Sequence, residues 1–241
     1  MKVWIFGDSF GAADTFGDEH HKTSWPNRLC KNHDVKNFAV SGSGPDYQLE
    51  LLFEQINKTN TNELKDTHVI FLMSHTCRKN FNFYTAPEDQ CFTNLIAQDR
   101  PGDWPEDANK IKKYDEYKDF IKKFYKHYKI DDFINNVVLL KEYAQFFHSL
   151  LVIPVFESVK DHQLYKKFGY MISNNDNFFL CNGKPLLDAV NGDKNKEQPN
   201  HTTPEVHRQI FDQLNSWLEN KNSIFNTDNL GWPYNYNIVL Y

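Results

Sequence analysis

Short runs of hydrophobic residues alternate along the chain with longer amphipathic segments. Four runs rich in β-branched and aromatic residues predict strands at about residues 3–6, 35–40, 68–73 and 150–156. The third run is apolar almost throughout, as is typical of a strand that is buried on both faces. Pro154 in the fourth run indicates a sheet edge or a strand end, because proline cannot donate a hydrogen bond to a neighbouring strand.

Three segments between or after these runs repeat apolar residues at helical spacing. They cover about residues 46–57, 134–148 and 204–220. Strands that alternate with helices are typical of a mostly parallel sheet covered by helices on both faces. We therefore expect an α/β fold.

A long stretch at about residues 82–132 interrupts this alternation, although connections in compact domains are usually short. Its second part repeats apolar and aromatic residues at helical spacing, from Ile111 to Tyr128. Two compatible interpretations stay open. The stretch is a helix that packs this stripe against the core, or a cap that shapes a pocket over one edge of the sheet. With no internal repeat and no linker, we expect a single domain over residues 1–241, with a cap insertion at about 82–132.

Composition and charge exclude several classes of function. Hydrophobic residues make up 40% and charged residues 24% of the chain, and the net charge is −5. This balance is ordinary for a globular protein, and it produces no field that would favour nucleic acid or an anionic membrane. No apolar run is long enough to span a bilayer, and no basic segment followed by an apolar one marks a signal peptide.

The four cysteines form no C-x-x-C pair, which favours reduced thiols and a cytoplasmic-type soluble protein. Lysine outnumbers arginine and asparagine is abundant, a bias typical of AT-rich genomes, including viral ones. A virion or a host cytoplasm is therefore also a candidate location. The oligomeric state is not visible in the sequence.

Small polar residues follow three of the predicted strands. Gly7-Asp8-Ser9 follows the first, residues 41–44 (Ser-Gly-Ser-Gly) follow the second, and residues 74–78 follow the third. The carboxyl ends of parallel strands meet at one edge of a sheet, which is where ligands bind in open α/β folds. Near the C-terminus, His201 stands shortly before the last predicted helix. Ser9 taken alone is either a turn residue or a nucleophile.

Taken in order, these segments resemble the motif blocks of the SGNH (GDSL-type) hydrolase family. Residues 7–10 (Gly-Asp-Ser-Phe), together with Trp25, Pro26 and Leu29 on a following helix, are similar to the first block. Residues 37–42 resemble its Asn-x-x-x-x-Gly element, and residues 201–207 resemble its catalytic histidine, a helix start and a second histidine. The resemblance covers most of the chain.

The resemblance implies a three-layer α/β/α sandwich of the flavodoxin-like, SGNH-hydrolase type, with a helical insertion. It also implies a serine esterase that acts on a small acyl ester and needs no metal or organic cofactor. The aromatic-rich insertion favours an acetyl group on a carbohydrate as the substrate.

The resemblance assigns roles to individual residues. Ser9 would be the nucleophile and His201 the general base. The backbone N–H groups of Ser9 and Gly42 would form an oxyanion hole, in which the loss of one donor costs on the order of 10²–10³ in rate. Thr76 stands where the family has an asparagine side chain as a further donor. The remaining candidates, for contact with the substrate, are Asp8, His75 and Arg78; Arg78 is equally compatible with a surface salt bridge.

Besides Thr76 in place of asparagine, the chain departs from the family pattern at the acid that orients the catalytic histidine. The family places it three residues before the catalytic histidine, where this chain has Gln198. A Ser–His dyad, a triad completed by Glu197 or another acid, and a loss of activity therefore all stay open. The alternative function is a weak or inactive SGNH-fold protein that binds glycans, for example on a viral particle.

Other classes of site are not favoured by the sequence. No H-x-x-x-H or H-E-x-x-H motif is present to hold zinc. The glycines near the N-terminus match neither G-x-G-x-x-G nor G-x-x-x-x-G-K-[ST], which argues against a dinucleotide or P-loop site.

Overall fold

The computed structural model describes residues 1–12, 23–41, 43–74, 78–84, 90–96, 132–156, 172–191 and 203–230, with 78–84, 90–96, 132–133 and 191 as backbone. Within these ranges the main sheet has five parallel strands in the order β2-β1-β3-β6-β7. The strands are β1 (Lys2–Phe6), β2 (Asp34–Asn37), β3 (Thr67–Met73), β6 (Ser149–Pro154) and β7 (Phe178–Leu180). Counted along the chain, this is the flavodoxin-like order 2-1-3-4-5.

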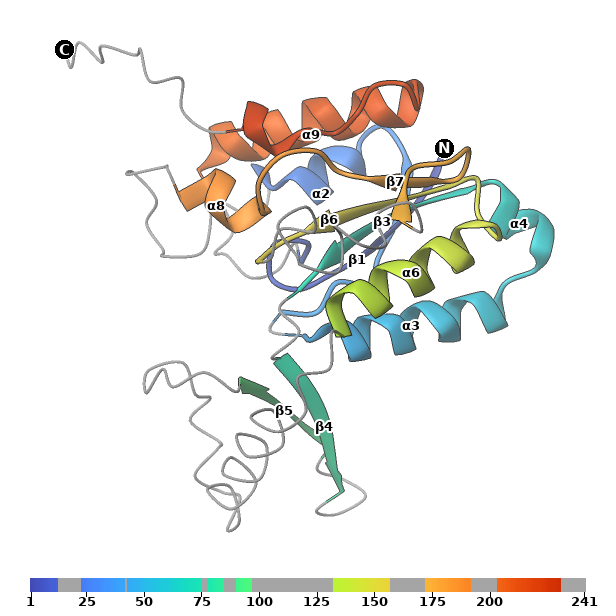
Figure 1. The fold of residues 1–241 in the computed structure, drawn as a ribbon, viewed down its shortest axis with the longest axis vertical. Helices are drawn as coiled ribbons and strands as arrows, with labels where there is room; N and C mark the ends of the chain where they lie inside the picture. The colour runs from blue at the N-terminus through green and yellow to red at the C-terminus, as the bar shows by residue number, and fades with distance from the viewer. Residues whose placement is uncertain are drawn as a thin grey trace, which may run out of the picture.

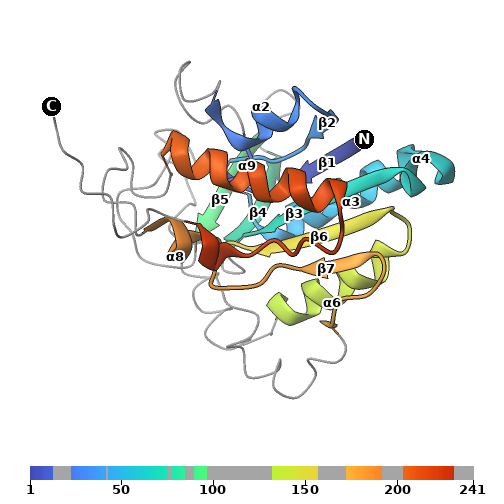
Figure 2. The same ribbon diagram turned by 90° about the horizontal axis from the view of Figure 1, so that it is seen from above.

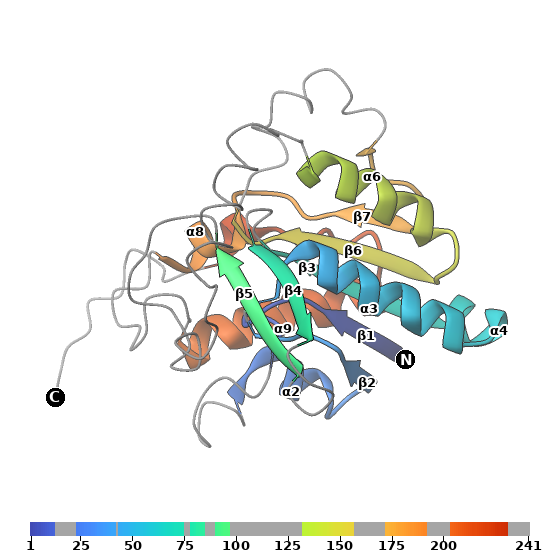
Figure 3. The same ribbon diagram turned by 90° about the horizontal axis from the view of Figure 1, so that it is seen from below.

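Helices cover both faces of this sheet (Figure 1). The helices on one face are α2 (Trp25–Leu29), α8 (Leu186–Asn191) and α9 (Pro204–Glu219). Those on the other face are α3 (Pro45–Lys58), α4 (Thr61–Lys65) and α6 (Asp132–Ala144). Figure 2 shows α9 lying across the first face, and Figure 3 shows α3 and α6 across the second. The expected three-layer α/β/α fold is confirmed.

Alternate residues of each strand supply the two hydrophobic cores, because successive side chains of a strand point to opposite faces. In β1, Val3 and Ile5 pack in the core under α9, whereas Trp4 and Phe6 pack in the core under α3 and α6. All seven residues of β3 are buried, as expected for a central strand. Pro154 is the last residue of β6, which lies inside the sheet, so of the two alternatives the strand end is the correct one.

The strongly patterned segments form the predicted elements, with differences at their ends. The second strand stops at Asn37 rather than at Val40, although the chain stays beside β1 through hydrogen bonds from the N–H groups of Phe38 and Val40. Helix α6 stops at Ala144 rather than at 148, because residues 145–148 form a turn that leads into β6. The short elements α4, β7 and α8 were not predicted; three to six residues are too few to show a period.

An antiparallel hairpin of β4 (Arg78–Tyr84) and β5 (Gln90–Ile96) follows β3. The sequence pattern predicted no strand here. Strand β4 contacts α3, on the side of the sheet that carries α6 (Figure 3). The hairpin occupies the start of the expected insertion at 82–132. Residues 97–131, which carry the aromatic stripe, lie outside the described residues, so the helix and the cap remain predictions.

No helix in the described part of the chain has the length and the apolar character needed to cross a membrane.

Candidate active site

The turn that carries Ser9 begins where β1 ends. The N–H groups of Gly11 and Ala12 both donate to the backbone oxygen of Asp8, at 2.9 Å each. The N–H of Phe10 donates to the side-chain Oδ1 of Asp8 at 3.1 Å. Asp8 therefore organises the turn with both its backbone and its side chain, as aspartate often does in turns.

Ser9 itself is half-buried and makes none of these bonds. Among the described residues, neither its hydroxyl nor its N–H has a hydrogen-bond partner. The three residues after it each use their N–H within the turn. The turn thus leaves one hydroxyl and one N–H available, both on the same residue, at the carboxyl end of β1.

Gly7 allows this turn to lie directly against β3. A Cβ atom at this position would stand 2.8 Å from the Cβ of Leu72 and 3.1 Å from its Cδ1. Real Cβ atoms do not approach each other so closely, so the packing requires glycine. The role of Gly7, the first residue of the motif, is therefore steric: it leaves room for Leu72 on the adjacent strand.

The side chain of Asp8 is fully buried, with 0% exposure. Its Oδ2 accepts a hydrogen bond of 3.0 Å from the hydroxyl of Ser74, the residue directly after β3. Both carboxylate oxygens therefore face donors of the protein. This placement differs from the substrate contact expected at Asp8 and makes the residue a link between the loops after β1 and β3.

Two other motif residues support the turn from outside. The side-chain amide of Asn37 donates to the backbone oxygen of Gly11 at 2.9 Å, and its Oδ1 accepts from the N–H of Ala39 at 3.0 Å. The indole N–H of Trp25 donates to the backbone oxygen of Phe10 at 2.8 Å. The residues by which the second motif block and the helix after Ser9 were recognised thus hold the Ser9 turn in place.

Helix α9 runs antiparallel to the strands and begins at the edge where Ser9 lies. Near its end, Trp217 packs edge-on against His68, the second residue of β3, with 6.0 Å between ring centroids. The 16 residues of α9 rise about 24 Å, close to the length of a seven-residue strand at about 3.3 Å per residue. Its first turn therefore lies at the carboxyl edge of the sheet, as Figure 2 shows.

Most of the other predicted site residues lie outside the described residues. These are Gly42, His75, Thr76, Glu197 and His201. Arg78 is described as backbone only, as the first residue of β4. The structure therefore places the Ser9 turn and the start of α9 at the same edge of the sheet, and the roles of these six residues stay predictions.

One acid near the start of α9 is already engaged. Glu205 receives two hydrogen bonds from the guanidinium of Arg208, at 2.7 Å and 3.0 Å. These bonds hold the pKa of the Glu205 carboxyl below its ordinary value. Glu205 is thus paired along the surface of its own helix, which does not favour it as the acid that orients His201.

Within the described ranges, no group of three or more His, Cys, Asp or Glu side chains is arranged to hold a metal ion.

The chain was compared with known proteins. No protein-family model and no curated protein sequence matches it. Among solved structures, the crystal structure of TesA is similar over 93% of this chain and 100% of its own, with a TM-score of 0.48 and 12% identity. The psychrotrophic esterase EstA from Pseudoalteromonas sp., inhibited by monoethylphosphonate, is similar over 91% and 99%, with a TM-score of 0.45 and 14% identity. Identities this low transfer no site residue to this chain.

Proposed function

We propose that this protein is an ester hydrolase of the SGNH type that uses Ser9 as its nucleophile. One observation carries the proposal. At the carboxyl end of β1, Ser9 presents a hydroxyl and an N–H that no described residue uses, on a turn whose following N–H groups are all bonded. A residue in this situation can supply both the attacking oxygen and a donor for the oxyanion that the attack creates.

The general base in this proposal is His201, which precedes the first residue of α9 by three positions. Because α9 begins at the same edge of the sheet as the Ser9 turn, we expect the segment before this helix, which carries His201, to reach the nucleophile. His201 takes the proton of Ser9 Oγ as the oxygen attacks the carbonyl carbon. It then returns this proton to the leaving alcohol when the C–O bond breaks. Water attacks the resulting acyl-enzyme by the same route and releases the carboxylic acid and Ser9.

The oxyanion hole consists of the N–H groups of Ser9 and Gly42, with Thr76 as a third donor from the loop after β3. Glu197 or a backbone carbonyl orients the second imidazole nitrogen of His201. A small acyl group, with acetyl on a carbohydrate as the first candidate, is the substrate class. His75 and Arg78 are the candidates for contact with its polar part.

Hydrolysis of p-nitrophenyl acetate by wild type, Ser9→Ala and His201→Ala tests the proposal. We expect both variants to lose at least about 10³ in kcat/KM, since a nucleophile and its base act as one unit. Ser216→Ala is the matched control, because this serine lies exposed on α9 and bonds only within its helix, to the backbone oxygen of Asp212. Equal activity in all four proteins would contradict the proposal.

A second assay addresses the substrate class. Acetate release from an acetylated oligosaccharide is compared with hydrolysis of p-nitrophenyl esters of increasing acyl length. We expect a preference for acetyl over octanoyl. Binding of the oligosaccharide without any ester hydrolysis would instead favour the glycan-binding alternative.

A further inference from the structure

Four buried polar side chains lie beneath the Ser9 turn, and we call them the buried polar cluster: Asp8, Ser43, Gln48 and Ser74. Their exposures are 0%, 0%, 1% and 1%. Each comes from a different segment, namely the loops after β1, β2 and β3 and the first turns of α3. The cluster therefore joins the three loops that carry Ser9, Gly42 and Thr76.

Gln48 is the member that no motif contains. It lies on the buried side of α3 beside Leu49 and Leu52, where an amphipathic helix normally places an apolar residue. Glutamine is rarely buried so completely, because its amide must then find several partners within the protein. The hydrogen-bond partners of the Gln48 amide explain why a polar residue is buried at this position.

The orientation of the Gln48 amide follows from its neighbours. With its oxygen toward the loop after β1, it accepts from the N–H of Asp8 at 3.2 Å, and its nitrogen donates to the backbone oxygen of Leu72 at 3.2 Å. In the reverse orientation the oxygen would face only acceptors and the nitrogen only donors, apart from contacts with Ser43. We therefore assign the first orientation.

Ser43 completes the connection. Its hydroxyl lies 3.0 Å from the amide oxygen of Gln48 and 3.0 Å from the backbone oxygen of Gly7, so its single hydrogen can be donated to either oxygen. Ser43 directly follows Gly42, the second proposed oxyanion donor. The amide of Gln48 is thus linked through one residue to the Ser9 turn and through another to the Gly42 loop.

The N–H groups on both sides of Ser9 are bonded to this cluster. The N–H of Asp8 donates to Gln48, and the N–H of Phe10 donates to the Asp8 carboxylate. Fixing both neighbouring peptides fixes the direction of the peptide between them, which carries the N–H of Ser9. Oxyanion donors are effective because they are oriented before the charge develops.

We propose that Gln48 is a positioning residue for the oxyanion hole, which fixes the direction of the Ser9 N–H. This inference rests on the proposed function. Gln48 touches neither the substrate nor the reacting atoms, and it acts through Asp8 and Ser43. A purely structural amide would affect stability alone, whereas a positioning amide affects the transition state more than substrate binding.

The test compares Gln48→Met with Leu52→Val, using p-nitrophenyl acetate well below the melting temperature of each variant. Methionine keeps the length of the side chain and removes its polar atoms. Leu52, one helical turn further along α3, is also fully buried but lies outside the cluster. We expect Gln48→Met to lower kcat about 10- to 100-fold with KM within twofold. Leu52→Val should leave both constants within twofold while lowering the melting temperature.

A conservative variant provides rescue. Gln48→Glu keeps an acceptor for the N–H of Asp8 and, once protonated, a donor for the oxygen of Leu72. Burial beside the Asp8 carboxylate raises the pKa of the new carboxyl. The ratio of its kcat to that of wild type should therefore rise as the pH is lowered. A ratio that stays low and flat across pH would contradict the proposal.

Ser43→Ala keeps the inference testable if Gln48→Met does not fold. This variant should lower kcat about 5- to 10-fold without raising KM, because it loosens one anchor of the amide. An active wild type, an inactive Ser9→Ala and unchanged kcat in the variants of Gln48 and Ser43 would overturn the positioning role alone. A wild type that hydrolyses no ester would overturn the proposed function, and the positioning role with it.

Discussion

At the scale of single residues, the Ser9 turn depends on contacts that its short motif does not display. Gly7 lies against Leu72, and the buried carboxylate of Asp8 bonds to the N–H of Phe10 and to Ser74. Gly7 and Asp8 are therefore required by the structure of the turn: glycine by the close contact with β3, and aspartate by its two buried hydrogen bonds.

Gly7→Ala tests the close approach to β3. The added Cβ would meet the Cβ of Leu72 at 2.8 Å, so the turn must move away from the sheet. We expect a loss of about 1–3 kcal/mol in the free energy of unfolding, together with a fall in kcat. Urea unfolding and the ester assay measure the two effects. Wild-type stability and turnover would show that the turn accommodates a methyl group.

At the scale of elements, a joint holds the segment after β7 against the end of the described chain. The N–H of Asn182 donates to the backbone oxygen of Phe225, and the N–H of Thr227 donates to that of Asn182. The 3-10 helix η3 (Thr227–Asn229) is thereby fixed beside the loop that leads into α8. The joint thus connects the residues just before α8 with those that follow α9, the two helices between which His201 lies in the chain.

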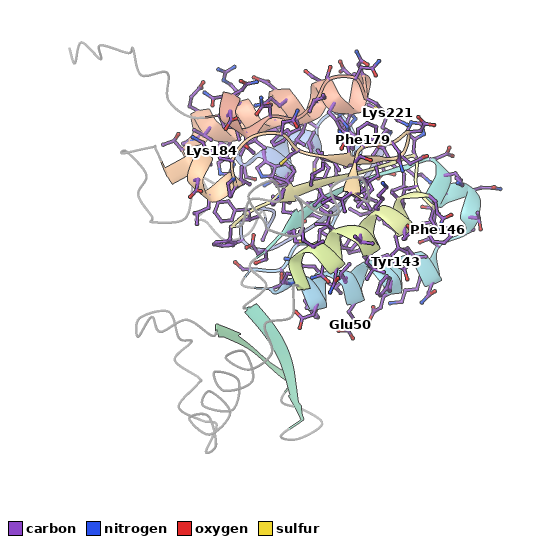
Figure 4. The ribbon with its side chains drawn as sticks, in the orientation of Figure 1. Glu50, Tyr143, Phe146, Phe179, Lys184 and Lys221 are labelled. Carbon is purple, nitrogen blue, oxygen red and sulfur yellow. The ribbon has the colours of Figure 1, made fainter. Side chains whose placement is uncertain are left out.

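Gly183→Ala tests this joint. Gly183 has a φ of +91°, and a Cβ there would stand 2.5 Å from Thr227 Oγ1. Both the left-handed backbone and the contact disfavour alanine, so we expect a loss of at least about 1–2 kcal/mol in the free energy of unfolding. Lys184→Ala is the control, because its side chain is exposed (Figure 4) and should change stability by less than about 0.5 kcal/mol. Equal effects of the two substitutions in urea unfolding would contradict this account.

At the scale of the whole molecule, the two edges of the sheet differ in character. The carboxyl edge holds the Ser9 turn and the buried polar cluster. The amino edge holds His68, which is 4% exposed, with its Nδ1 2.8 Å from Ser149 Oγ and its ring 4.5 Å from that of His148. Lys221 also lies at this edge (Figure 4). It donates to the backbone oxygen of His148 at 2.9 Å.

This arrangement predicts how stability depends on pH. Burial, and after it the positive charges of His148, Lys221, the amino terminus and His33, lower the pKa of His68 from 6.5 to about 3. Burial and Lys221 lower the pKa of His148 in the same direction, which nearby Asp66 opposes. The unfolded chain therefore binds more protons than the native protein between these values, and stability falls as the pH drops from 6.5 toward 3.

Urea unfolding of wild type and His68→Leu between pH 7 and pH 4 measures this effect. The contribution of His68 should amount to a few kcal/mol at most. We expect the stability of the variant to fall less steeply than that of wild type over this range. His33→Gln serves as the comparison at a half-buried histidine of the same edge. Parallel curves for wild type and His68→Leu would show that His68 is not the group responsible.

Much of the fold could be predicted from local pattern. The strands β1, β3 and β6 and the helices α3 and α9 follow from apolar runs and helical spacing, because these elements are long or fully buried. The strand β7 has three residues and α8 has six, which is too short for a period to show. The β4–β5 hairpin was missed because its alternation is short: residues 80–83 (Asn-Phe-Asn-Phe) alternate polar and aromatic residues, whereas β5 has no regular alternation.

The candidate site, like the fold, could be predicted from the sequence only in part. The order of small motifs along the chain was sufficient to single out Ser9, since a glycine-rich turn after an apolar run has a local signature. Gln48 had no such signature, and neither did the bonding partner of Ser74, although Ser74 itself begins the polar segment after the third predicted strand. Gln48 reads as an ordinary polar position on an amphipathic helix, and Ser74 bonds to a residue 66 positions away in the chain.

The sequence by itself determined the α/β class, the position of Ser9 after the first strand, and the resemblance that makes an esterase the leading interpretation. Only the tertiary structure decided that Asp8 faces inward, that Ser9 keeps a free hydroxyl and N–H among the described residues, and that Gln48 joins the loops beneath it. The reason is physical. Helical and strand periods are set by neighbours in the chain, whereas the partners of a buried polar group are set by whichever segments the fold brings together.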